Sequence, residues 1–178
     1  MQTRHGDNPK ALTRANELVI YSLLQSRDLA FDYQVSVPFA DCALGSETGC
    51  AYLDFLLLKP WGKVILEVDE GQRAHYPPGC DVRRDFDILA SVALGSADKL
   101  CIIRYNPDAQ QIGGVAQPLL KAQRESKLLQ VLQELETEPE LPFSRLYLYY
   151  NRAAHDSPLP LVADSWPEEV KAVSRCLA

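Results

Sequence analysis

Residues 51–69 read AYLDFLLLKPWGKVILEVD, and this stretch decides the fold. Two apolar runs, 51–58 and 63–68, flank a short turn that contains Pro60 and Gly62. Apolar runs of this length, bounded by turn residues, are typical of buried strands, and the short turn joins them as an antiparallel pair. The sequence therefore predicts a central β-hairpin.

Outward from the hairpin, helical and strand patterns alternate. Helical spacing after Asn8 predicts a helix from Pro9 to about Leu29, and the apolar–polar alternation over 31–39 predicts a half-buried strand. Further patterns predict a helix over 81–94, a strand over 99–105, a helix from Pro118 to about Leu135, a strand over 145–150 and a short tail helix over 167–177. The predicted order is α-β-β-β-α-β-α-β, which is an α/β fold.

Length and composition bound the class of protein. The 178 residues suit a single domain, with a core over about 8–150 and a tail over 151–178. The chain has 24 acidic and 18 basic side chains, which argues against a protein that coats nucleic acid by charge alone. Without a membrane-length apolar run or a signal-peptide pattern, we expect an intracellular protein, in the cytoplasm, nucleoid or nucleus, with no membrane partner. The five scattered cysteines indicate reduced thiols.

Three carboxylates, Asp54, Glu67 and Asp69, interrupt the apolar hairpin. Glu67 and Asp69 are two residues apart, so a strand puts both on one face, and hairpin pairing can bring Asp54 alongside them. Burying unpaired charges is costly, and clustered carboxylate oxygens suit Mg²⁺, Mn²⁺ or Ca²⁺. The pattern predicts a divalent-metal site. In the alternative, these acids pair with arginines at the strand ends; the candidates are Arg73, Arg83 and Arg84.

The chain contains the segments YLDF (52–55), EVDEGQ (67–72) and IRYNPD (103–108), with a predicted helix that carries Arg83 and Arg84 between the last two. Together they resemble the PD-(D/E)xK nuclease superfamily, and in particular its Vsr-like endonuclease branch with relatives in large DNA viruses and homing elements. The resemblance covers about residues 17–108. It implies a restriction-endonuclease-like αβββαβ core, with a mixed central sheet flanked by helices.

The resemblance also implies the ligands of a catalytic Mg²⁺ or Mn²⁺ ion. Asp54 and Glu67 match the acids that bind this ion in the superfamily. Asp69 stands where most members have lysine, as it does in the Vsr-like branch, and is the third expected ligand. Glu17 matches a glutamate of the first helix that helps to hold a metal-bound water.

Other residues are implied to act on the water or on the phosphate. Gln72 or His75 would orient the attacking water or protonate the leaving oxygen. Arg73 stands where the branch has histidine, which is the main departure from the family pattern. Four arginines are candidates for phosphate contacts: Arg73, Arg83, Arg84 and Arg104. The alternative for the last three is salt bridges to carboxylates, namely Asp81, Asp85 or Asp87.

The implied function is a divalent-metal-dependent endodeoxyribonuclease, with DNA as its partner and a homodimer as one way to cut both strands. The first alternative is a catalytically inactive module that keeps the fold and binds nucleic acid or protein, which the departure at Arg73 favours. A second alternative is a small-molecule metallohydrolase that uses the same acids. Cleavage of plasmid and single-stranded DNA distinguishes the nuclease from the inactive module, and phosphodiesterase turnover without DNA cleavage would indicate the metallohydrolase.

Cysteine and tyrosine side chains add secondary expectations. A structural Zn²⁺ site would combine His75 and Cys80 with Cys42 and Cys50, although these spacings match no known finger pattern. Cys101 is expected to be buried and to behave as a small apolar residue. For the tyrosines of 147–150, strand packing is favoured over base stacking. The glutamates of 134–140 are expected to form a solvated acidic edge.

Overall fold

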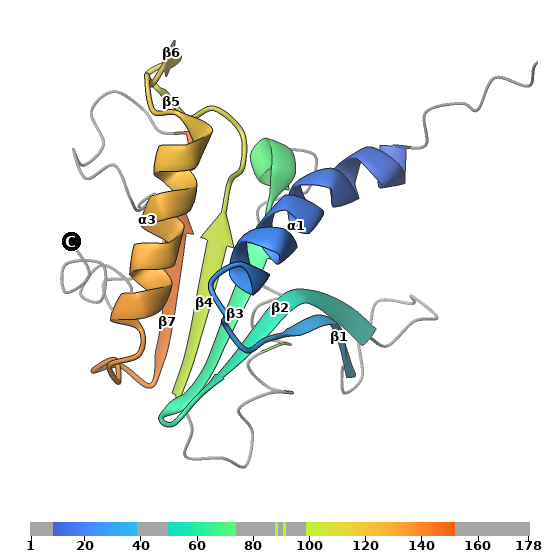
Figure 1. Cartoon of the computed structure of the whole chain (residues 1–178), viewed down its shortest axis with the longest axis vertical. Coiled ribbons are helices and arrows are strands. Elements are labelled where there is room, and N and C mark those ends of the chain that lie inside the picture. The colour runs from blue at the N-terminus through green and yellow to red at the C-terminus, as the bar shows by residue number, and fades with distance from the viewer. Residues whose placement is uncertain (1–8, 39–49, 74–87, 89–90, 92–98, 152–178) are drawn as a thin grey trace, which may run out of the picture.

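The structure is a computed structural model that describes residues 9–38, 50–73, 88, 91 and 99–151. A five-stranded mixed sheet forms its centre, and two long helices lie against one face of that sheet (Figure 1). The strands are ordered β1-β2-β3-β4-β7 across the sheet. Their bounds are β1 (Asp32–Pro38), β2 (Cys50–Lys59), β3 (Gly62–Val68), β4 (Lys99–Tyr105) and β7 (Phe143–Leu148).

The sheet is antiparallel on one side and parallel on the other. β1, β2 and β3 pair antiparallel, whereas β3, β4 and β7 pair parallel. Parallel neighbours need a crossover connection, and α3 (Lys121–Glu134) lies between β4 and β7 in the chain. Between β3 and β4, Ile88 and Ser91 are helical, and the rest of the helix predicted over 81–94 lies outside the described residues. The predicted α/β fold with a mixed central sheet is confirmed.

Two apolar clusters pack on opposite faces of the sheet. The helix-face cluster joins α1 (Pro9–Gln25) and α3 to the sheet through residues such as Ile20, Leu128 and Leu66. The opposite-face cluster comprises Val37, Leu53, Ile65, Ile88, Leu100 and Ile102. Strand alternation explains the division, because the consecutive residues Ile65 and Leu66 point to opposite faces. The inner strands β3 and β4 are therefore apolar on both faces.

The first helix is shorter than predicted. It ends at Gln25 rather than near Leu29, because Asp28 adopts a left-handed conformation with φ 53°. The Leu29 N–H donates to the Leu24 carbonyl oxygen at 3.2 Å and closes the last turn of the helix. Glycine is the residue usually found at such a left-handed position, so Asp28 gave no stop signal in the sequence.

Two later elements also differ from the predicted bounds. The helix predicted from Pro118 begins at Lys121, because Leu120 is extended, with φ -67° and ψ 150°. The strand predicted over 145–150 ends before Tyr149, whose φ of 64° is incompatible with a strand. Both differences arise from single residues whose backbone conformation the hydrophobic pattern does not report.

Two small elements were not predicted. β5 (Gln111–Ile112) and β6 (Val115–Ala116) form a two-stranded hairpin, and η1 (Glu70–Arg73) is a short 3-10 helix after β3. Gly113 and Gly114 have φ of 58° and 78°, and two-residue hairpin turns favour glycine at such angles. The Gly-Gly pair carried this signal, but strands of two residues are too short to show an alternation.

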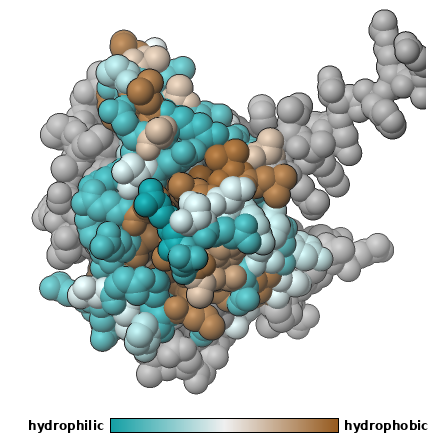
Figure 2. Space-filling view, viewed as in Figure 1, coloured by the Kyte–Doolittle hydropathy of each residue, from teal (hydrophilic) through white to brown (hydrophobic). Residues whose placement is uncertain are grey.

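The surface over the helices is mostly hydrophilic. Figure 2 shows hydrophilic residues over much of α3 and a hydrophobic patch over α1, where Leu18 and Val19 are exposed. Among the described residues, neither helix combines the length and apolar character that crossing a bilayer requires.

Candidate functional site

Asp54 lies on β2, next to the point where the pairing with β3 ends. Pairing between these strands ends with Phe55 opposite Leu66. The next residue of β2 is Asp54, and its Oδ2 accepts the Val68 N–H at 2.8 Å. A side-chain oxygen therefore takes the place of a backbone acceptor at the end of the ladder, and this bond orients the Asp54 carboxylate.

Glu67 follows Leu66, the last residue of β3 that pairs with β2, and Asp54 precedes Phe55, the partner of Leu66. Its side chain is only 3% exposed, and its neighbour in the parallel β3–β4 ladder is Arg104. A carboxylate at this depth is tolerated only with compensating positive charge or hydrogen-bond donors. Two of the three acids that the hairpin pattern singled out therefore lie next to the last pair of the hairpin, one on each strand.

Asp69, the third acid, is engaged by its own partners. It follows the end of β3, and its Oδ2 accepts two hydrogen bonds of 2.6 Å, from Arg104 Nε and from the Tyr150 hydroxyl. Burial raises the pKa of the Tyr150 hydroxyl, and the charge of Asp69 raises it further, so this phenol stays protonated and donates. Arg104 is 1% exposed and forms an ion pair with Asp69, so a phosphate contact by Arg104 stays a prediction.

Glu17 is linked to Asp54 by Gln34, which the sequence did not predict as a site residue. Its Oε2 accepts hydrogen bonds from the Tyr33 hydroxyl at 3.1 Å and from Gln34 Nε2 at 2.9 Å. The same Gln34 nitrogen lies 3.5 Å from Asp54 Oδ1. α1, β1 and β2 therefore meet in one chain of polar side chains. In the sequence, Gln34 was only one of the polar residues in a strand-like alternation.

The remaining predicted site residues lie at or beyond the limit of the described chain. Gln72 and Arg73 are the last two residues of η1 and are described by their backbone alone, and Cys50 begins β2. The others lie outside the described residues and are His75, Arg83, Arg84, Cys42 and Cys80. Their roles toward water, phosphate or Zn²⁺ stay predictions.

Glu70 is a further acidic residue close to Glu17. Burial raises the pKa of the Glu70 carboxyl, hydrogen bonding to Asn16 opposes this rise, and the charges of Glu17 and Asp108 add to it. Carboxylates therefore come from α1, from η1 and from the segment after β4. Glu70 therefore lies close to both Glu17 and Asp108.

Side chains of the IRYNPD segment (103–108) form hydrogen bonds that connect the end of β4 to the ends of β3 and β7. Asn106 Nδ2 donates to the Tyr149 carbonyl at 2.8 Å, which connects the end of β4 to the end of β7. Asp108 Oδ2 accepts the Gly71 N–H at 2.7 Å, which connects the same segment to η1 after β3. The polar residues of this motif thus hold in place the backbone that carries Asp69.

Several secondary predictions are confirmed. Cys101 is fully buried, and burial raises the pKa of its thiol to about 12. Tyr147 and Tyr149 are buried in the sheet, as expected for strand packing. The acidic edge after α3 is exposed, and two of its glutamates bind lysines of the sheet: Glu136 pairs with Lys59, and Glu138 pairs with Lys99.

The donor set of the site fits a hard divalent cation. Within 9–38, 50–73 and 99–151, no three His, Cys, Asp or Glu side chains form a metal-binding group. Mg²⁺ nevertheless binds through one or two protein carboxylates and keeps several waters. Asp54 and the buried Glu67 supply two such carboxylates, each next to the last pair of the hairpin. Asp69, the third expected ligand, uses its Oδ2 for both Arg104 and Tyr150.

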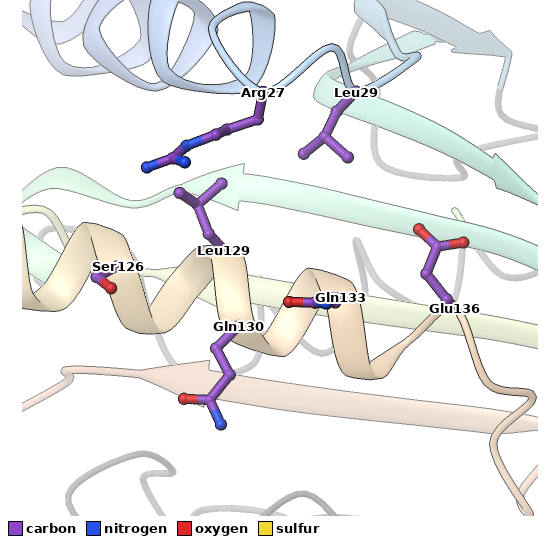
Figure 3. Close-up of a pocket in the computed structure, with 7 residues that line it drawn as sticks. All are labelled: Arg27, Leu29, Ser126, Leu129, Gln130, Gln133 and Glu136. Atoms are coloured by element: carbon purple, nitrogen blue, oxygen red, sulfur yellow. The ribbon is translucent and has the colours of Figure 1, made fainter.

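A pocket elsewhere on the surface lacks comparable chemistry. It lies between the segment after α1 and the outer side of α3, where Arg27 and Leu129 point toward one another (Figure 3). Its other lining groups are largely amides and a serine, and its carboxylate, Glu136, is paired with Lys59. The pocket therefore gathers no set of groups suited to catalysis or metal binding.

Comparison with known proteins gives no match: no protein-family model, no curated protein and no solved structure matches this chain.

Proposed function

We propose that the protein is a divalent-metal-dependent endodeoxyribonuclease with a PD-(D/E)xK-type site. The observation that carries the proposal is the placement of Asp54 and Glu67. Both interrupt strands of apolar residues, and each lies next to Phe55–Leu66, the pair at which the pairing of β2 and β3 stops. Glu67 is buried and Asp54 is half-buried. Carboxylates placed in this way are unfavourable without a compensating charge, so their presence in two apolar strands favours a site that recruits a cation.

The order of elements supports the proposal. One helix precedes three antiparallel strands, and the fourth strand of the sheet lies parallel to the third. A restriction-endonuclease-like core is expected to have this order, with its acids on the second and third strands. Asp54 lies on the second strand and Glu67 on the third.

In the proposed reaction, Asp54 and Glu67 hold the cation, and DNA supplies the phosphodiester. The bound cation would polarise the phosphate and lower the pKa of a coordinated water. Glu17 joins the site through Gln34, while Arg104 and Tyr150 hold Asp69 beside it. The proposed roles of Gln72 and His75 toward water, and of the arginines toward phosphate, complete the hypothesis.

One observation favours a second candidate, an inactive module that binds nucleic acid or protein. Lysine usually stands two residues after the strand glutamate in the superfamily, whereas this chain has Asp69 there, as the Vsr-like branch does, and has Arg73 where that branch has histidine. The Asp69 carboxylate is bound by Arg104 and Tyr150 rather than directed to a reacting group. A site without that lysine depends on other residues to activate water.

The test is cleavage of supercoiled plasmid and of single-stranded DNA with Mg²⁺ or Mn²⁺. We expect the wild-type chain to cut, and the variants Asp54→Asn and Glu67→Gln to lose about 10²- to 10³-fold in rate, as is typical when one electrostatic group leaves a reaction centre. Asp32→Asn is the matched control, because Asp32 is an exposed carboxylate of β1. Its rate should equal that of the wild type.

Two outcomes would contradict the enzyme proposal. One is wild-type protein that cuts neither substrate with either cation. The other is cleavage that persists at the wild-type rate in Asp54→Asn and Glu67→Gln. In the first case, DNA binding without cleavage would support the inactive module.

A further inference from the structure

We propose that Gln34 is a positioning residue for the Asp54 carboxylate, which it holds in one orientation through its side-chain amide. The inference rests on the proposed function, because the orientation of Asp54 matters to a cation only if Asp54 binds one. Three observations carry the inference: the backbone conformation of Gln34, the course of the two strands around it, and the hydrogen bonds of its amide.

The backbone of Gln34 is strained. Its φ is 54°, in the left-handed region, although it lies inside β1. This region is unfavourable for a residue with a Cβ, and glutamine lacks the short side chain that lets Asn and Asp adopt it more readily. Among the described non-glycine residues, Asp28 and Tyr149 share this conformation, and both lie just beyond the end of an element. Strain within a strand persists only where the surroundings enforce it, and it concentrates at functional sites.

In both β1 and β2, the side chains change from one face of the sheet to the other, and they do so at the same position of the pairing. Tyr33 and Phe55 pack in the helix-face cluster, whereas Val35 and Leu53 pack in the opposite-face cluster. Residues two apart in a regular strand share a face, so each strand changes face at the residue in between. The register is unchanged across this point, since Tyr33 pairs with Phe55 and Val35 pairs with Leu53. The residues in between are Gln34 and Asp54.

The amide of Gln34 lies between two carboxylates. Its Nε2 donates to Glu17 Oε2 at 2.9 Å and approaches Asp54 Oδ1 at 3.5 Å. Ionised carboxylates only accept hydrogen bonds, so the nitrogen with its two hydrogens must face both of them. The Tyr33 hydroxyl also donates to Glu17, at 3.1 Å. Glu17 thereby anchors the amide, and the amide places partial positive charge against Asp54.

Asp54 is consequently held from two strands. Val68 of β3 donates to its Oδ2 at 2.8 Å, and Gln34 of β1 lies against its Oδ1. A carboxylate fixed at both oxygens loses rotational freedom before any cation arrives. Residues that orient a ligand in this way typically contribute about 10- to 100-fold to metal affinity or activity.

The test replaces Gln34 by glycine in the full chain. Glycine accepts a φ of 54° without strain, so Gln34→Gly removes the amide and does not penalise the backbone. In metal-free buffer, we expect a thermal midpoint equal to or above that of the wild type. We expect Mn²⁺ affinity, measured from the paramagnetic resonance signal of free Mn²⁺, to weaken by about 10- to 100-fold, with plasmid cleavage falling in parallel.

Two further variants separate the amide from the backbone. Asp28→Gly relieves a left-handed residue with φ 53° at an exposed position after α1, and should bind Mn²⁺ as the wild type does. Gln34→Met keeps the length of the side chain and the strain but lacks the amide. It should lose Mn²⁺ affinity to the same extent as Gln34→Gly.

The outcomes distinguish this inference from the proposed function. Wild-type Mn²⁺ affinity in Gln34→Gly, or an equal loss in Asp28→Gly, would overturn the role of Gln34. If Asp54→Asn weakens Mn²⁺ binding while Gln34→Gly does not, the inference alone is wrong. If wild type and Asp54→Asn bind Mn²⁺ equally, the proposed function itself is contradicted, and the role of Gln34 with it.

Discussion

Asp69 shows how a buried charge acquires partners that its own strand does not supply. Its carboxylate is 5% exposed and is neutralised by Arg104 of β4, with a second hydrogen bond from Tyr150 after β7. Replacing a buried ion pair as a whole is often tolerated, whereas removing one partner leaves an uncompensated charge in a medium of low polarity. Arg104 is therefore the residue on which Asp69 most depends.

We expect Arg104→Met to lower the free energy of unfolding by about 3–5 kcal/mol, because it leaves Asp69 buried without its ion pair. Urea denaturation followed by circular dichroism measures the change. Arg27→Met, at an exposed arginine, is the control and should stay within about 0.5 kcal/mol of the wild type.

The double variant Arg104→Met with Asp69→Leu should recover part of the loss, since it removes both charges together. A cost below about 1 kcal/mol for Arg104→Met alone would show that Asp69 does not rely on the Arg104 contact.

At the level of elements, the β2–β3 turn is tightly constrained at Gly62. Gly62 has φ 152°, and a Cβ placed on it would lie 2.1 Å from the Lys99 carbonyl oxygen. The backbone of β3 therefore approaches that of β4 more closely at this point than any side chain allows. The parallel pairing that places Glu67 beside Arg104 begins at this Gly62–Lys99 contact.

We expect Gly62→Ala to destabilise the fold by about 1–3 kcal/mol, because the methyl group must displace backbone rather than a flexible side chain. Thermal unfolding measures the effect. Gly114→Ala is the matched control: its φ of 78° strains alanine, but nothing lies within 4 Å of the added Cβ. Equal losses in the two variants would mean that conformation, and not the close approach to β4, is what Gly62 supplies.

At the scale of the whole molecule, charge is divided between the two ends of the sheet. The acidic segment after α3 binds Lys59 and Lys99 at the end where β3 and β4 begin. The acids proposed for the site lie at the other end, where β3 finishes. Each of these Lys–Glu pairs is neutral, so the net charge of -6, which is a sum over the whole chain, does not describe the charge at the proposed site.

Stability as a whole should fall at alkaline pH. Burial raises the pKa of the Tyr105 hydroxyl from 10.0 to about 12 and that of the Cys101 thiol from 9.0 to about 12. A raised pKa in the folded state contributes stability below the ordinary pKa, and this contribution is lost as pH rises through the folded value. For Tyr105 the loss between pH 10 and 12 is about 3 kcal/mol, at about 1.4 kcal/mol per pKa unit.

Urea denaturation at pH 8 and pH 11 measures this dependence. Tyr105→Phe removes one buried ionisable group, so its free energy of unfolding should fall less between the two pH values than that of the wild type. Tyr52→Phe, at an exposed tyrosine of β2, should keep the wild-type dependence. The same pH dependence in all three proteins would contradict the assignment to Tyr105.

The sequence by itself determined the hairpin, the two-faced apolar strands and the positions of Asp54 and Glu67. These features depend on residues close together in the chain, because strand period, turn chemistry and hairpin pairing are local. The helix ends at Asp28 and Leu120 were missed, since a single backbone angle sets each of them.

Only the tertiary structure decided which groups surround those acids. The Asp69–Tyr150 hydrogen bond spans 81 residues of sequence, and Gln34 reaches Glu17 on a separate helix. Such contacts depend on which strands become neighbours and on where a strand changes face, and packing of the whole sheet sets both. Local pattern therefore located the carboxylates, while their hydrogen-bond partners followed from the fold.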